Sequence, residues 1–415
     1  MPASLMSSLW DLPGPRQFIY RTGRNLLEGL NPVVLYPPGV DRYGIKHELL
    51  KSIERDFFLD VRVLDAGAED MNGGSQDPFT MLCRMFPELR DYGAFERTIE
   101  APCLPDVILV DNLGNCPKDI QVAWLRVLNR WRQASQATGV RRSLLLLIPA
   151  DAAVRLSLPT SDVRLSYQVW AGIPTALEVR LLCRMKTEGS DFDSQWREYM
   201  LASLAGNDIG MCESLWDVIT CPTADIIEAL KCYAATQTWH VDTIESALTR
   251  WNPKPPGHEF GINPHETGFS LLSQGITMYT PEYGEEINSA LLAALGWEHE
   301  IRHRIWRAQA ALLMPMIDEV RRRICDHMTA QYGPDWAVIN GEHNTSPLEW
   351  GKLKLFFENL PRQTQEKALW GPGIRQAWLI RNRISHYTPI TYRDYCDFWN
   401  LSVSVRRNSN RRNGR

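Results

Sequence analysis

Four short aliphatic runs in the first 150 residues constrain the fold more than any other feature of the chain. They are PVVLYPP (32–38), DVRVLDA (60–66), PDVILVDNL (105–113) and RRSLLLLIPA (141–150). Runs of this kind predict strands that are buried on both faces of a sheet. Helical stretches at 45–58 and 119–135 lie between them. Because strand–helix alternation is typical of parallel sheets, we expect a mostly parallel α/β domain over residues 15–172.

The pattern becomes helical after this region. Residues 173–250 have apolar positions at spacings of three and four, which predicts a helical, lid-like extension of the α/β domain. Residues 251–268 carry four prolines and three glycines and are predicted to be a linker. Residues 269–405 then predict an all-α helical bundle. Its first long element, over 297–328, is an amphipathic helix or helix pair that Pro315 bends or breaks.

Composition and charge place the chain among globular proteins. Its 415 residues are 44% hydrophobic and 23% charged, which argues against bulk disorder. The formal net charge is −4, but residues 406–415 hold five arginines and no acid, so the rest of the chain is more acidic. We expect a disordered basic tail at 406–415, which is compatible with an anionic partner.

Cysteine usage and hydropathy indicate in which cellular compartment the protein is expected. The nine cysteines form no Cys-x-x-Cys pair and no Cys/His cluster at zinc spacing, so we expect reduced thiols and no metal site. The start of the chain lacks the pattern of a signal peptide. The longest aliphatic stretch, 144–148, is too short to cross a bilayer. We therefore expect a cytoplasmic protein without a membrane partner.

The loop after the first predicted strand, YPPGVDRYGIKHEL, carries part of a phosphate-binding pattern. A working loop has the form G-x-x-x-x-G-K-[ST], because backbone N–H groups wrap the phosphates, the lysine reaches them and the hydroxyl binds magnesium. Gly39 and Gly44 keep the glycine spacing, whereas Lys46 is displaced by one residue and His47 replaces the hydroxyl residue. Weak or lost nucleotide binding is the expectation.

Asp111 ends the run VILVD, at the place where such folds carry a magnesium-coordinating acid. Asn112 follows it, where ATP-hydrolysing members place a glutamate that orients water. In the order of its elements, the region 15–250 resembles an AAA+ or STAND-type ATPase core. The resemblance, with both motifs imperfect, implies a degenerate domain that does not hydrolyse ATP. Weak binding of ATP and magnesium stays open as one alternative, and an unrelated α/β fold as another.

An arginine and a histidine separated by four residues occur three times, whereas the composition predicts about 0.8 such pairs by chance. Spacing alone therefore cannot identify a site. The pairs are Arg42/His47, Arg322/His327 and Arg381/His386. Only the third has an asparagine, Asn382, directly after the arginine, and only it ends an apolar helical run just before a Tyr-Thr-Pro turn.

The block LIRNRISHYTPITYRDYCDF (379–398) resembles the C-terminal helix region of HEPN domains, whose signature is arginine, a polar residue, a few residues and histidine. The helical array at 285–405 is similar to a HEPN bundle of four or five helices with an insertion near 333–348. The resemblance implies metal-independent RNA cleavage without a cofactor. Arg381 would contact the scissile phosphate, His386 would transfer a proton and Asn382 would assist.

Helix geometry limits how Arg381 and His386 could form one site. Residues five apart on a helix are about 140° out of phase, whereas Asn382 and His386, four apart, share a face. One helix therefore does not close such a site. HEPN ribonucleases usually join two copies of the motif, so the resemblance implies a homodimer through the C-terminal domain.

The pairing of a P-loop-type module with a HEPN-like domain looks like a bacterial conflict system, antiphage defence or toxin–antitoxin, with further protein partners. Two alternatives stay open. One is an inactive assembly subunit of a multiprotein complex, and the other is a nucleotide-dependent switch that binds RNA or nucleotide without cutting. In a purely structural reading, Arg381 pairs with a surface acid and His386 caps the helix C-terminus. The nearby aromatic residues either stack bases or, more in keeping with their helical spacing, fill the bundle.

Overall fold

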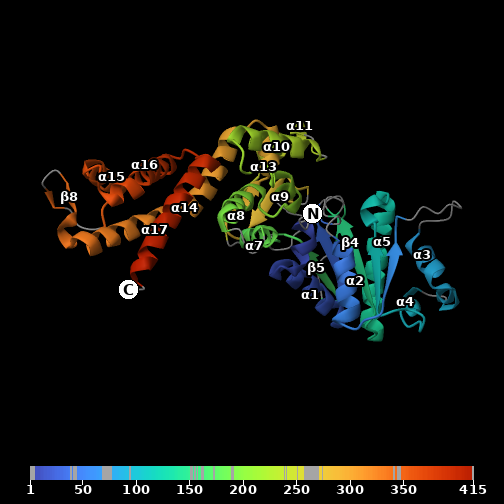
Figure 1. The fold of residues 1–415 in the computed structure, drawn as a ribbon. Coiled ribbons are helices and arrows are strands. Elements are labelled where there is room, and N and C mark those ends of the chain that lie inside the picture. The colour runs from blue at the N-terminus through green and yellow to red at the C-terminus, as the bar shows by residue number, and fades with distance from the viewer. Residues whose placement is uncertain are drawn as a thin grey trace. The chain divides into compact units, whose positions relative to one another are not determined.

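The computed structural model of the chain divides into two compact units (Figure 1). One unit is formed by Met1–Glu178 and Trp239–Asn288, and the other by Val179–Thr238 and Ser289–Arg415. The structure describes residues 5–37, 40, 44–67, 77–92, 95–149, 153, 156, 158–159, 163–171, 173–187, 191–237, 239, 241–249, 251–256, 271–272, 274–339, 342–343 and 347–413.

The first unit contains a five-stranded parallel sheet, as predicted. The strands are β1 (Asn31–Tyr36), β2 (Val61–Asp65), β3 (Val107–Asp111), β4 (Ser143–Pro149) and β5 (Leu165–Val169), and their order in the sheet is β2-β3-β4-β1-β5. The four predicted strands are all present. The fifth was not predicted because its sequence, LSYQV, alternates buried with partly exposed positions and lacks an aliphatic run.

Helices cover both faces of this sheet. They are α1 (Pro13–Leu27), α2 (Ile45–Arg55), α3 (Pro78–Met85), α4 (Phe95–Thr98) and α5 (Lys118–Thr138). Trp124 and Trp131 of α5 are buried in one core cluster with Ile108 and Leu146 of the sheet, whereas α1 and α2 pack on each other. The connections that leave β1 and β3 run toward opposite edges, so right-handed crossovers place α2 and α5 on opposite faces.

The same unit includes the end of the predicted lid and part of the chain that follows it. Helix α11 (Val241–Leu248) is followed by the antiparallel hairpin β6 (Thr277–Thr280) and β7 (Gly284–Ile287). The predicted linker at 251–268 is described only to residue 256, and there the backbone oxygen of Lys254 accepts a hydrogen bond from the N–H of Glu285 at 2.8 Å. The described start of this segment is therefore bonded to strand β7.

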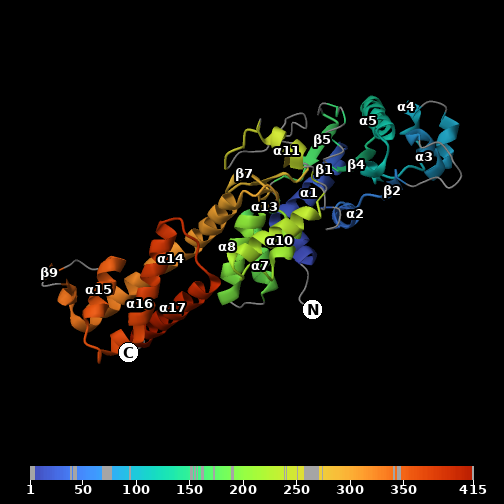
Figure 2. The same cartoon turned by 90° about the horizontal axis from the view of Figure 1, so that it is seen from above.

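The second unit is helical. Its elements are α8 (Asp191–Ala205), α9 (Ile209–Leu215), α10 (Thr223–Ala235), α13 (Ser289–Ala294), α14 (Glu298–Tyr332), α15 (Trp350–Asn359), α16 (Gln365–Ser385) and α17 (Tyr392–Asn413), while α7 (Ala176–Lys186) crosses the division. Helices α14, α16 and α17 run alongside one another in Figures 1 and 2.

Most of the predicted lid-like segment at 173–250 belongs to this helical unit and does not extend the α/β unit. The reason is a set of buried polar and aromatic contacts. The Ser203 hydroxyl of α8 donates to the Arg304 carbonyl of α14 at 2.9 Å, and the Arg304 guanidinium donates to Ser289 at 2.6 Å. Phe192 of α8 stacks on Tyr395 of α17, with the ring centroids 5.2 Å apart. Apolar periodicity does not reveal which neighbours a helix has.

Helix α14 is one element of 35 residues with Pro315 inside it, so the chain is not broken there. Leu312 and Leu313 before the proline and Ile317 and Val320 after it are all buried. Packing along the whole helix offsets the hydrogen bond that proline removes.

The regions predicted as an insertion and as a disordered tail both contain secondary structure. The insertion near 333–348 holds a 3-10 turn (Pro334–Trp336) and the short antiparallel pair β8 (Val338–Ile339) and β9 (Glu342–His343). Helix α17 continues to Asn413, and thus through most of the predicted tail. Within the described part of the chain, no helix combines the length and the hydropathy that a bilayer crossing requires.

Gly373 of α16 provides a test of the packing between α16 and α17. A Cβ at this position would lie 2.8 Å from Leu401 Cδ1 and 3.1 Å from Leu401 Cβ. We expect Gly373→Ala to lower the free energy of unfolding by about 1–3 kcal/mol, as overpacking does. The matched control is Gly351→Ala in α15, where the new Cβ would have only Trp378 Nε1 within 4 Å, at 3.9 Å. Denaturant unfolding of both variants measures the difference, and equal stabilities would contradict the described packing.

Candidate functional site

Two of the predicted nucleotide-binding residues meet at the carboxyl edge of the parallel sheet. Lys46 is the second residue of α2, and Asp111 is the last residue of β3. The Lys46 Nζ lies 2.5 Å from the Asp111 Oδ2, and Asp111 is only 8% exposed. Gly44 precedes α2 with a φ of +82°, a left-handed conformation that suits glycine. Gly39 lies outside the described residues.

The Lys46–Asp111 pair lies where parallel sheets bind ligands. Strand β4 separates β3 from β1, and the connections leaving β4 and β1 diverge at this edge. Open α/β sheets bind their ligands at such a switch point. Here, however, the lysine that would reach a phosphate is bonded to the carboxylate that would hold magnesium. His47 is exposed and supplies no hydroxyl.

Asp65 is a residue at this edge that the sequence reasoning missed. It ends β2 in register with Asp111, so the two side chains lie on the same face of the sheet. Its Oδ1 accepts a hydrogen bond from the N–H of Gly67 at 2.9 Å. The sequence does contain a signal for Asp65: the aliphatic runs of β2 and β3 both end in an aspartate. Among the described residues, no group of three or more His, Cys, Asp or Glu side chains is arranged to hold a metal ion.

The predicted catalytic residues lie at the C-terminal end of α16. Arg381 Nη1 donates a hydrogen bond to Asn382 Oδ1 at 3.2 Å, and both side chains are half-buried. His386 is exposed and is the C-cap residue of the helix. Its backbone N–H, and not its ring, makes the capping bonds to the carbonyls of Asn382 and Arg383, at 3.0 and 3.1 Å. The cap therefore leaves the imidazole accessible.

The two arginines beside Asn382 have different roles. Arg383 donates to the Asp394 carboxylate at 3.1 Å and to the Pro389 carbonyl at 2.8 Å, so it ties the end of α16 to the start of α17. Within the described part of the chain, Arg381 forms no ion pair with a carboxylate; its described partner is the Asn382 amide. This differs from the structural alternative, in which Arg381 pairs with a surface acid.

Helix α14 fixes the turn that follows His386. Tyr387 has a φ of +56° and reverses the chain, and its ring lies 4.5 Å from that of Trp306. The Trp306 indole N–H donates to the Ile384 carbonyl at 2.6 Å. The buried Gln309 amide donates to the Ile390 carbonyl at 3.0 Å and accepts from the Ile390 N–H at 2.8 Å.

Of the other two arginine–histidine pairs, Arg322/His327 lacks this accessible arrangement. Arg322 is bonded to Asp318 at 2.8 Å. The His327 side chain is 12% exposed, lies 3.8 Å from Glu366 Oε1 and packs edge-on against Trp370. Of the pair Arg42/His47, His47 is exposed and Arg42 lies outside the described residues.

Most of the aromatic residues near this end of the chain fill the bundle. Trp370 and Tyr395 are buried, and Tyr395 donates to the Phe192 carbonyl at 3.0 Å. The Tyr392 hydroxyl donates to the Asp193 carboxylate, and burial together with that hydrogen bond raises the pKa of Tyr392. These three rings are therefore not positioned to stack nucleobases. Tyr387 is exposed.

The geometry at the end of α16 is suited to bind an anionic group at the surface. It combines a guanidinium, an amide and an imidazole on one helix end, with no described carboxylate bonded to the guanidinium. A comparison of the chain with protein-family models finds no match, and a comparison with curated proteins finds no significant sequence similarity. A function for this chain is therefore inferred from the arrangement of its residues and from its motifs.

Gln309 is the clearest test of how this helix end is held. We expect Gln309→Leu to lower the free energy of unfolding by about 2–4 kcal/mol, because the buried N–H and C=O of Ile390 both lose a partner. Amide hydrogen exchange at Thr388–Thr391 should also accelerate. The matched control is Gln376→Leu, which removes a single side-chain bond to Asp394 at a partly buried position. Unchanged exchange in Gln309→Leu would show that other contacts hold the turn.

Proposed function

We propose that the C-terminal helical unit is a HEPN-type endoribonuclease whose catalytic residues are Arg381, Asn382 and His386. The observation that supports it is the accessible His386 ring on the same helix end as Arg381, whose described partner is an amide and not a carboxylate. The third pair thus combines an exposed histidine with an arginine available to a phosphate. The short sequence resemblance points to the same three residues.

The proposed reaction is an attack of the ribose 2′-hydroxyl on the adjacent phosphorus. A base removes the proton from the 2′-hydroxyl, the O2′–P bond forms, and the P–O5′ bond breaks as the leaving oxygen takes up a proton. His386 transfers one of these protons, since imidazole is a suitable acid and base near neutral pH. Arg381 stabilises the charge that develops on the phosphate oxygens, and Asn382 orients Arg381 through their hydrogen bond.

We further propose that two copies of the chain complete the site. Arg381 and His386 are five residues apart on one helix, so their side chains point in directions about 140° apart. A second copy can supply the facing histidine or arginine. The active form is therefore a homodimer through the helical unit, and DNA is not cleaved because it lacks the attacking hydroxyl.

In this proposal the α/β unit is a scaffold or sensor that does not hydrolyse ATP. The Lys46–Asp111 bond supports this, as does Asn112 in place of a water-orienting glutamate. Cleavage controlled by such a unit fits a bacterial defence or toxin–antitoxin system, in which partner proteins restrain the nuclease.

The ribonuclease is tested with purified protein and total RNA in EDTA. We expect wild type to cleave the RNA, and His386→Ala and Arg381→Ala each to reduce the rate at least about 100-fold, the scale of acid–base and charge-stabilisation effects. Gel electrophoresis over a time course measures the rates.

Arg322→Ala is the matched control for Arg381→Ala, because it removes an arginine from the same unit in a pair of identical spacing. The Arg322→Ala variant should cleave the RNA at the wild-type rate. No cleavage by wild type as a dimer, or equal cleavage by all variants, would favour the inactive assembly subunit.

The state of the α/β unit is tested with ATP and magnesium. We expect no ATP turnover, and no rise in Tm at millimolar ATP, because Lys46 and Asp111 are bonded to each other. Differential scanning fluorimetry of wild type and Lys46→Ala measures this. A rise of several degrees that Lys46→Ala abolishes would instead favour the nucleotide-dependent switch.

A further inference from the structure

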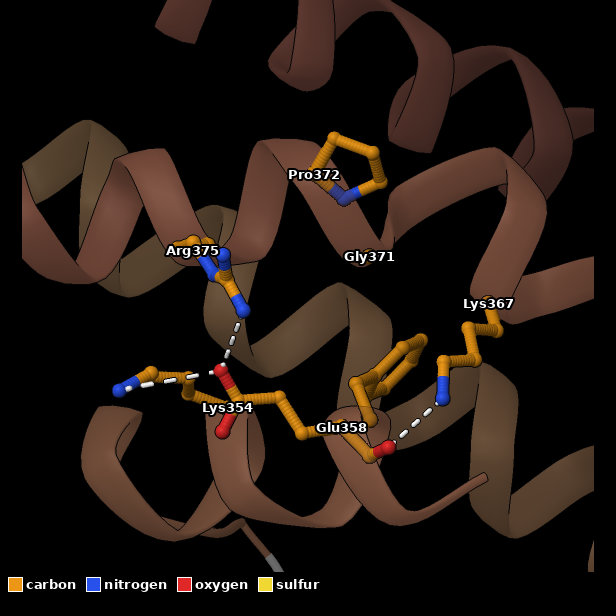
Figure 3. A pocket seen from close by; sticks show the side chains of 7 residues that line it. Lys354, Glu358, Lys367, Gly371, Pro372 and Arg375 are labelled. Atoms are coloured by element: carbon orange, nitrogen blue, oxygen red, sulfur yellow. Dashed lines mark hydrogen bonds and ion pairs between the residues drawn. The ribbon is translucent and has the colours of Figure 1, made fainter. Parts of the chain in front are cut away.

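A pocket between α15 and α16 has no role in the reaction proposed above (Figure 3). Its volume is about 410 Å³, within the range of small-molecule sites. Three cationic side chains, one carboxylate, a buried phenylalanine and a Gly-Pro step line it: Lys354, Lys367, Arg375, Glu358, Phe357, Gly371 and Pro372.

The cations of the pocket differ in how far they are already bonded. Lys367 donates to the carbonyls of Glu358 and Leu360, at 2.6 and 2.5 Å, and so caps the C-terminus of α15. Arg375 donates to the Glu358 carboxylate at 2.9 Å, and its side chain is 65% exposed, so other N–H groups of the guanidinium face solvent. Figure 3 shows its guanidinium pointing to Glu358 across the pocket.

Lys354 adds a second charge at the same side of the pocket. Its Nζ lies 3.9 Å from the centre of the Trp378 ring and 3.8 Å from the Glu358 carboxylate. Lys354 and Arg375 thus share one carboxylate, which leaves a net positive charge between them. Such a pair is suited to bind a phosphate group.

The Gly371-Pro372 step is unfavourable for a helix interior and has no explanation in the packing. Pro372 removes a helical N–H, and Gly371 relieves the clash that a proline imposes on the preceding residue. Gly373, by contrast, is required by the close contact with Leu401. A Cβ at Gly371 would meet only Lys367 Cγ within 4 Å, at 3.6 Å. Local departures from helix-forming sequence of this kind occur at functional sites.

The pocket lies in line with two of the three proposed catalytic residues. Arg375, Asn382 and His386 are separated by seven and four residues, so they lie within about 40° of one another on the surface of α16. The eleven residues from Arg375 to His386 span roughly 16 Å along the helix axis. That length corresponds to about five stacked nucleotides of one strand.

We propose that this pocket is a subsite for one nucleotide of the RNA strand, several nucleotides away from the link that is cleaved. Arg375 and Lys354 bind its phosphate, and the base lies against Phe357 and Pro372. The subsite rests on the proposed ribonuclease function, and it holds and orients the strand without contacting the reacting atoms. The subsite binds the phosphate and makes no contact with the 2′-hydroxyl.

The test measures binding of a fluorescein-labelled, 2′-O-methylated RNA 12-mer, which cannot be cleaved by 2′-hydroxyl attack. We expect Arg375→Gln to weaken binding about tenfold, the loss of one charge-assisted hydrogen bond. The slope of log K against log salt should fall in magnitude by about 0.7, the value for one phosphate contact of a single strand. Fluorescence anisotropy at several salt concentrations gives both quantities.

Arg322→Gln is the matched control, because Arg322 is 62% exposed and is likewise bonded to one carboxylate. It should bind the 12-mer as wild type does, with an unchanged salt slope. Equal binding by Arg375→Gln and Arg322→Gln would overturn the subsite whether or not RNA is cleaved. If wild type fails to cleave unmodified RNA but Arg375→Gln still weakens binding selectively, the subsite stands and the nuclease does not.

Discussion

The hydrogen bonds by which α14 holds the end of α16 are the interaction on which the proposed site depends. Gln309 satisfies both backbone groups of Ile390, and Trp306 donates to the carbonyl of Ile384. Both side chains come from a helix that is packed along its length, and the exposed Arg383 adds bonds to Pro389 and Asp394, so the turn after α16 is held by α14 and by its own arginine. His386 can therefore be exposed and still have a defined backbone position, which general acid–base catalysis requires.

The two candidate sites differ in whether their charges are already paired. At the sheet edge, Lys46 and Asp111 neutralise each other at 2.5 Å, and a nucleotide would have to separate them before it gained either group. At the end of α16, Arg383 takes the available carboxylate of Asp394, which leaves Arg381 bonded to an amide. An arginine held by a neutral partner keeps its charge available to a phosphate. Because of this difference, we propose that RNA is cleaved by the helical unit.

The sequence predicted the sheet and the positions of most helices, because buried aliphatic runs and amphipathic periodicity are local properties. It did not predict β5, whose residues Leu165–Val169 alternate in burial, nor that α8 would pack with α14 and α17. Neighbours of that kind depend on contacts such as Phe192 on Tyr395, about 200 residues apart in the chain. Local sequence was likewise insufficient to identify the candidate sites. Spacing alone gave three arginine–histidine pairs, and the asparagine after Arg381 singled out one of them. The fold adds that the His327 side chain is 12% exposed, whereas His386 is exposed.

The central claim is that Arg381, Asn382 and His386 cleave RNA through attack of the 2′-hydroxyl. The most direct measurement is mass spectrometry of the ends formed when the wild-type protein acts, in EDTA, on a defined single-stranded RNA. Intramolecular attack predicts 2′,3′-cyclic phosphate and 5′-hydroxyl ends, and a substrate with a single 2′-deoxy residue at the cleaved link should stay intact. Products with 3′-hydroxyl and 5′-phosphate ends, or an RNA left whole, would contradict the account.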